Sequence, residues 1–103
     1  MYVQLLTDAL DGWVLASDRY DVVAHAIECR TKMLLASPYK GEPAFRALAA
    51  QVSYDRSLIK LCEVFGIATS PDKFSDALSE RGRLERELAH AGLDLNKMSR
   101  ARL

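Results

Sequence analysis

The sequence predicts an all-α protein, a compact single-domain bundle of about five helices. Its length of 103 residues is typical of one domain, and half of the residues are hydrophobic, which is enough for one core. Apolar residues recur at three- and four-residue steps in nearly every segment, and no segment shows the convincing alternation of a strand. We expect the bundle to cover residues 1–93 and residues 94–103 to form a short C-terminal tail that is a candidate for disorder.

The first predicted helix covers residues 2–16. Asp11 and Gly12 are a turn signal inside it, but the helical period continues through them, so we predict one helix with a weak point. Its apolar stripe is wide, which indicates burial on more than one side. The stripe consists of Tyr2, Val3, Leu5, Leu6, Ala9, Leu10, Trp13, Val14 and Ala16.

The second predicted helix follows three candidate N-cap residues, Ser17, Asp18 and Asp21. It ends at Ser37, because the proline that follows pushes this residue out of helical geometry. Residues 37–43 contain two prolines and a glycine and form the clearest loop of the chain. One face of the helix consists of Val22, Val23, Ala26, Ile27, Arg30, Met33 and Leu34.

The middle of the chain, residues 44–67, is interpreted as two short helices joined by a tight turn. The first ends near Val52, and Ser53 is well placed to cap the second. Gly66 stands where a helix end favours a left-handed residue, and Ile67 supplies the apolar contact that accompanies such an end.

Residues 68–75 are interpreted as a linker that contains a helix-start signal, Ser70-Pro71-Asp72, and the last predicted helix runs to about Ala91. Gly82 interrupts it at a cost of about 1 kcal/mol relative to alanine. Its exposed face is densely charged, with opposite charges three and four residues apart. Gly92 then repeats the ending seen at Gly66.

The predicted helix pair at residues 44–67 resembles the first helix-turn-helix motif of AraC-type transcription activators. The resemblance covers about a quarter of the chain. It departs from the family's pattern at Tyr54 and Asp55, which replace the usual small capping residues, and the chain is too short for a complete second motif. The residues that carry the resemblance are Leu48, Ala49, Ala50, Gln51, Val52, Leu58, Leu61, Phe65, Gly66 and Ile67.

The resemblance implies DNA binding and names three candidate nucleic-acid contacts. Arg56 and Lys60 would lie one turn apart on the face of the second helix that enters a major groove, and Arg46 would reach phosphate. Asp55 and Glu63 beside them would repel the DNA backbone. A DNA-binding regulator is therefore the alternative function, behind a protein-interaction module.

The charge balance argues against a general nucleic-acid binder. Fourteen basic residues balance fourteen acidic ones. The distribution is uneven, because residues 1–28 hold five acidic residues and one basic, whereas residues 29–60 hold six basic and two acidic. The chain shows no secretory signal and no apolar run long enough to span a membrane. With two cysteines that are most simply interpreted as reduced, we expect a cytoplasmic protein.

Metal binding and catalysis have weaker support. The chain holds a Cys2His2 set by number, which consists of His25, Cys29, Cys62 and His90. Only His25 and Cys29 are close enough in sequence to bind the same metal ion. The same pair could be named base and nucleophile, although nothing in the sequence supplies an oxyanion site. We therefore expect no metal, no cofactor and no enzymatic activity.

A protein-interaction or regulatory module without chemistry of its own is the primary interpretation. Tyrosine and tryptophan are enriched at interfaces, and Tyr39 and Tyr54 are candidate members of a partner surface. The partner would be another protein, or a second copy of the chain in a homodimer. A nucleic acid is the second class of partner.

Overall fold

The computed structural model describes residues 2–11, 19–35 and 44–100. The prediction of an all-α bundle is confirmed, since this part of the chain contains five α-helices, one short 3-10 helix and no strand. Its Cα radius of gyration of 13.0 Å is that of a compact domain of this length. The elements are α1 (Tyr2–Leu10), α2 (Arg19–Leu35), α3 (Ala44–Phe65), η2 (Pro71–Asp76), α4 (Ala77–His90) and α5 (Leu95–Arg100).

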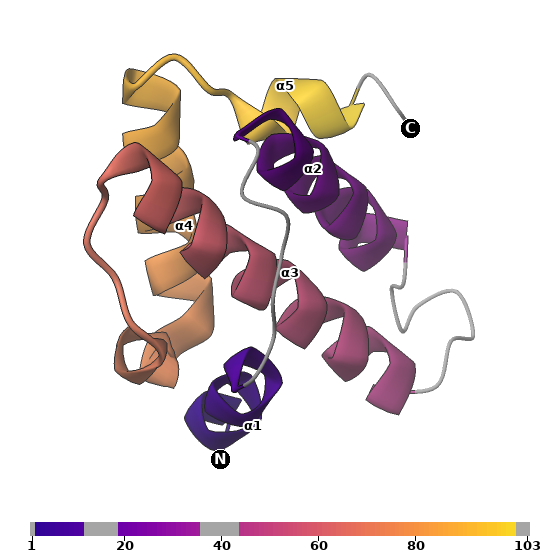
Figure 1. Ribbon diagram of the computed structural model, residues 1–103. Helices are drawn as coiled ribbons and strands as arrows, with labels where there is room; N and C mark the ends of the chain where they lie inside the picture. Colours follow the sequence, from indigo (N-terminus) through magenta and orange to yellow (C-terminus); the bar gives the residue numbers. More distant parts are fainter. Residues whose placement is uncertain (1, 12–18, 36–43, 101–103) are drawn as a thin grey trace.

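Helix α3 crosses the whole molecule, and α1, α2 and α4 pack against it (Figure 1). Helix α2 runs beside it in the opposite direction, α1 lies across its first half, and α4 covers the other side (Figure 1). Its apolar residues recur at three- and four-residue steps, so one face is buried along its length. The buried apolar residues of α3 are Ala47, Tyr54, Leu58, Ile59, Leu61 and Cys62.

The prediction of two short helices within residues 44–67 is wrong. Residues 44–65 form one continuous helix, so the turn expected at Ser53 is absent and the segment contains no helix-turn-helix. The physical reason is that no glycine or proline interrupts these residues. Tyr54 and Asp55, directly after the expected turn, are fully buried, and they fix the helix in place through neighbouring elements.

The two glycine helix ends are confirmed. Gly66 has a φ of 74° and Gly92 a φ of 100°, both in the left-handed region. The Ile67 N–H donates to the Cys62 carbonyl at 2.8 Å, and the Leu93 N–H donates to the Leu88 carbonyl at 2.8 Å. These bonds satisfy carbonyls that the helix leaves unpaired.

The last predicted helix is divided in the structure. Residues 71–76 form the 3-10 helix η2, and α4 begins only at Ala77. Phe74 departs from helical geometry with a ψ of 19°, and this change of direction buries its ring. Asp76 then caps α4 by accepting the Ser79 N–H at 3.4 Å.

The expectation that residues 94–103 form a loose tail is corrected for residues 94–100. Asp94 accepts the Lys97 N–H at 3.0 Å, as an N-cap residue does, and α5 follows. Leu95 and Ser99 are buried, and α5 packs against α2 and α4. An aspartate at an N-cap followed by a leucine is a local signal for the start of a helix, and it is present here at Asp94 and Leu95.

Several predictions lie outside the described residues. They are the extension of the first helix to residue 16, the N-caps Ser17 and Asp18, the loop at 37–43 with Tyr39, and residues 101–103. Asp21 lies inside the first turn of α2 rather than at its cap. None of the helices in the described part of the chain combines the length and the hydropathy that a membrane crossing requires.

Candidate functional site

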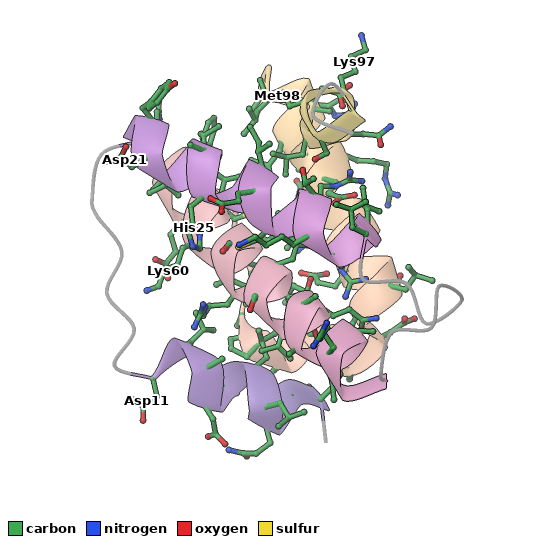
Figure 2. All side chains as sticks on the ribbon, turned by 90° about the vertical axis from the view of Figure 1, so that its right-hand side faces the viewer. Asp11, Asp21, His25, Lys60, Lys97 and Met98 are labelled. Atoms are coloured by element: carbon green, nitrogen blue, oxygen red, sulfur yellow. The ribbon has the colours of Figure 1, made fainter. Side chains whose placement is uncertain are left out.

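A groove of about 500 Å³ lies between α2 and α3, and we call it the α2–α3 groove. Figure 2 shows His25 where α2 faces α3. Helix α1 lies on the far side of α3 from α2 in the same view. The lining residues are His25, Cys29, Lys32, Arg46, Ala49, Ala50, Ser53 and Arg56.

Helix α2 supplies one wall of the groove. His25, Cys29 and Lys32 are spaced by four and three residues, which places their side chains one above the other on a single face. The core side of the same helix is held by Val22 and Ala26, which are buried. The face that meets the groove is therefore fixed by the burial of the neighbouring apolar face.

Helix α3 supplies the opposite wall and the floor. Arg46, Ala49, Ser53 and Arg56 are spaced by three, four and three residues, so they also share one face. The small side chains between the two arginines leave room for the hollow. At 1.5 Å per residue, the arginine Cα atoms are about 15 Å apart along the helix. This spacing exists only because α3 is continuous.

The lining of the groove is basic. Lys32, Arg46 and Arg56 line it, and none of the described lining residues carries a carboxylate. The Lys32 ammonium is 3.2 Å from the Glu28 carboxylate, but both side chains are largely exposed, so the pair holds Lys32 only weakly. The basic lining is a property of the groove and not of the whole chain, whose net charge is zero.

A polar cluster lies at the groove, where Ser57 of α3 meets His25 and Cys29 of α2. The Ser57 Oγ is 2.9 Å from His25 Nδ1 and donates to Cys29 Sγ at 3.5 Å. The Cys29 Sγ is itself 3.8 Å from His25 Nδ1. Ser57 is buried, whereas His25 and Cys29 are partly exposed. A thiol, an imidazole and a hydroxyl are thus in mutual contact.

An apolar pocket of about 350 Å³ adjoins the groove on the α1 side of α3. Its lining includes Leu5, Leu48 and Val52, and it shares Ala49 and Ser53 with the α2–α3 groove. Leu5 and Leu48 are both exposed by about two fifths. A cationic surface and an apolar one therefore meet along the first half of α3.

The buried carboxylates of the core set the orientation of α3. Arg81 of α4 binds the Asp55 carboxylate through two hydrogen bonds of 2.7 Å, and the Tyr2 hydroxyl of α1 donates to the same carboxylate. Burial raises the pKa of Tyr2, and its contact with Asp55 raises it further. This network ties α1 and α4 to α3 and keeps Asp55 away from solvent.

A second network ties α2 and α4 to α3. The Arg30 Nε donates to Glu85 Oε2 at 2.9 Å, and the Tyr54 hydroxyl donates to the same oxygen. Burial raises the pKa of Tyr54, and the nearby charge of Glu85 raises it further. The two networks fix the positions of α2 and α3, and hence the width of the groove between them.

The structure separates the predicted site residues. Arg46 and Arg56 line the groove, and Lys60 continues their spacing along α3 beyond it, 3.6 Å from the Glu63 carboxylate. Tyr54 is fully buried, so its assignment to a partner surface is wrong. Tyr39 lies outside the described residues.

The four residues of the Cys2His2 set do not come together. Cys62 is buried in the core and His90 is exposed at the end of α4, away from the His25 and Cys29 pair on α2. Over the described ranges, no group of three or more potential metal ligands is found.

Sequence reasoning missed the contributions of Lys32 and Ser57. Both are placed by the pairing of α2 with α3, which no local pattern predicts. The spacing of Arg46, Ala49, Ser53 and Arg56 was a usable signal, but only if residues 44–65 are interpreted as one helix.

No protein-family model, no curated protein and no solved structure matches the chain.

Proposed function

We propose that this protein is a non-catalytic binding module that takes an acidic segment of a partner protein into the α2–α3 groove. The observation that carries the proposal is the gathering of Lys32, Arg46 and Arg56 around a hollow whose described lining has no carboxylate. Complementary charge of this kind selects partners and speeds their encounter. Because both cysteines are free thiols, we place this binding in the cytoplasm.

The adjoining apolar pocket narrows the class of partner. Ala49 and Ser53 line both hollows, so a bound segment that fills the groove also reaches Leu5 and Leu48. The segment that fits is amphipathic, with glutamate or aspartate side chains facing the groove and one aliphatic side chain facing the pocket. Burial of that side chain supplies affinity that exposed charges alone do not.

A protein partner is favoured over duplex DNA. Helix α3 is continuous and α2 lies along it, so the cationic face forms the wall of a groove and not the free ridge that enters a major groove. The zero net charge of the chain also lacks the electrostatic footprint of a nucleic-acid binder.

The first prediction concerns binding of a fluorescent peptide that alternates glutamate and leucine. We expect measurable anisotropy at low ionic strength and weaker binding at physiological salt, because exposed charges are screened over about 8 Å at 0.15 M. Arg46→Ala and Arg56→Ala should each raise Kd by about three- to tenfold, and Leu48→Ser should do so for this peptide but not for an all-glutamate one.

Lys97→Ala is the matched control, because Lys97 is an exposed helical lysine on α5, remote from the groove (Figure 2). Equal Kd values for the Arg46→Ala, Arg56→Ala and Lys97→Ala variants would contradict the proposal. Displacement of the peptide by duplex DNA at equal charge concentration would move the assignment to a nucleic acid. A dimer in native mass spectra that the Arg46→Ala and Arg56→Ala changes dissociate would make a second copy of the chain the partner.

A further inference from the structure

The α2–α3 groove holds a thiol as well as positive charge. We propose that Cys29 is a modification site at which small disulfides bearing carboxylates are captured by thiol–disulfide exchange. The inference goes beyond binding of a partner segment, because it concerns a covalent step at one side chain. It stands on the contact of Cys29 with His25 and Ser57 and on the cations beside them.

The hydrogen bonds at Cys29 run toward its sulfur. The Ser57 hydroxyl donates to Cys29 Sγ at 3.5 Å, so its oxygen is left to accept a hydrogen bond from His25 Nδ1, which is 2.9 Å away. The nucleophile in thiol–disulfide exchange is the thiolate, and a hydroxyl that donates to the sulfur is a partner that a thiolate can accept from.

The basic residues beside Cys29 favour an anionic reagent. Lys32, Arg46 and Arg56 line the groove with Cys29, and Glu28 on α2 is exposed and pairs with Lys32. Positive charge that lines a hollow attracts an anionic reagent. A hollow of about 500 Å³ is large enough for a molecule of the size of a small disulfide.

The exchange balances without a further reactant. The Cys29 thiolate attacks one sulfur of the disulfide, a new S–S bond forms to Cys29, and the original S–S bond breaks. The electron pair of the broken bond leaves on the second sulfur as a thiolate, which takes a proton from solvent or from His25. Cys29 is oxidised and the departing sulfur is reduced by the same amount.

The second cysteine is an internal control. Cys62 is fully buried on α3, and burial raises the pKa of its thiol to about 12. It therefore presents neither an accessible sulfur nor a thiolate at neutral pH. The two cysteines of the chain should differ in rate by a wide margin in the folded protein.

The test compares two chromogenic disulfides, the dianionic dithiobis(nitrobenzoate) and the uncharged dithiodipyridine. In native protein we expect one thiol per chain to react rapidly, and two after denaturation. Cys29→Ser should remove the rapid phase, while Cys62→Ser should retain it. Modification should proceed faster with the dianionic reagent than with the neutral one, relative to the same ratio for free cysteine.

The charge variants test the groove. Arg46→Ala and Arg56→Ala should each lower the dianionic-to-neutral rate ratio by about threefold at low salt, because unit charges about 7 Å apart in water interact with an energy near RT. Lys97→Ala should leave the ratio unchanged. A ratio equal to that of free cysteine, or one that the two arginine changes do not alter, would overturn the proposal, as would a rapid phase that survives Cys29→Ser.

Ser57 is a positioning residue, because its hydroxyl donates to the Cys29 sulfur. Ser57→Ala should slow the modification by both reagents, and Ser57→Thr, which keeps a hydroxyl, should restore the rate. Equal rates for the two Ser57 variants would show that the hydroxyl does not position the sulfur. Cys29→Ser should still bind the acidic peptide, so failure of this inference is distinguishable from failure of the proposed function.

Discussion

Among single residues, we expect the substitution of Asp55 to cause the largest loss of stability. It is fully buried, its two oxygens accept two hydrogen bonds from Arg81, and Tyr2 donates to one of them. The side chain of Arg81 is only 12% exposed, so it has little access to water as a replacement. Removing the carboxylate would leave a buried cation without its partner.

We expect Asp55→Ala to lower the free energy of unfolding by about 3–5 kcal/mol, measured by urea denaturation. Glu63→Ala is the control, because the Glu63 carboxylate belongs to an exposed pair with Lys60 and its loss should cost less than about 1 kcal/mol. The double variant Asp55→Ala with Arg81→Ala should recover part of the loss. Similar costs for Asp55→Ala and Glu63→Ala would show that the network contributes no more than a surface pair.

At the scale of elements, the glycines of the described helices occupy two kinds of position, helix ends and a helix interior. Gly66 and Gly92 end α3 and α4 with positive φ, whereas Gly82 lies inside α4 without one. A β-carbon added at Gly66 would meet nothing within 4 Å, so only backbone strain opposes it. A β-carbon at Gly82 would be 3.5 Å from the Arg86 Nη1, an ordinary contact with the end of a flexible side chain.

We therefore expect opposite signs from the same substitution. Gly82→Ala should raise the free energy of unfolding by about 0.5–1 kcal/mol, because alanine is the better helix former. Gly66→Ala should lower it by about 1–2 kcal/mol, because a left-handed conformation is unfavourable for alanine. Thermal unfolding followed by circular dichroism measures both, and a stabilised Gly66→Ala variant would contradict the left-handed assignment.

The same elements show what the sequence could and could not predict. Gly66 and Gly92 were sufficient for the ends of α3 and α4, because the left-handed requirement is local. Ser53 was misleading, since serine favours both caps and exposed helix positions, and only the burial of its neighbours Tyr54 and Asp55 decides between them. The groove could not be predicted from the sequence, because it depends on which face of α2 meets α3.

For the whole molecule, α5 is part of the core. Leu95 is 1% exposed, in contact with the same apolar cluster as residues of α2, α3 and α4. We expect Leu95→Ala to cost about 2–5 kcal/mol and to lower the unfolding midpoint of the entire chain in one transition. Met98→Ala, at a 40% exposed position of the same helix, should change it little. Local loss of α5 with an unchanged midpoint elsewhere would contradict this.

Each end of the described chain packs against a segment that is distant from it in the sequence. Helix α1 packs against η2 and α3, and α5 packs against α2 and α4. During synthesis on the ribosome, α1 and α2 emerge before η2 and α5, although both also pack against α3. The parts of their apolar faces that η2 and α5 cover therefore stay exposed until residues 71–100 have been synthesised, which makes the nascent chain a substrate for chaperones that hold exposed apolar helices.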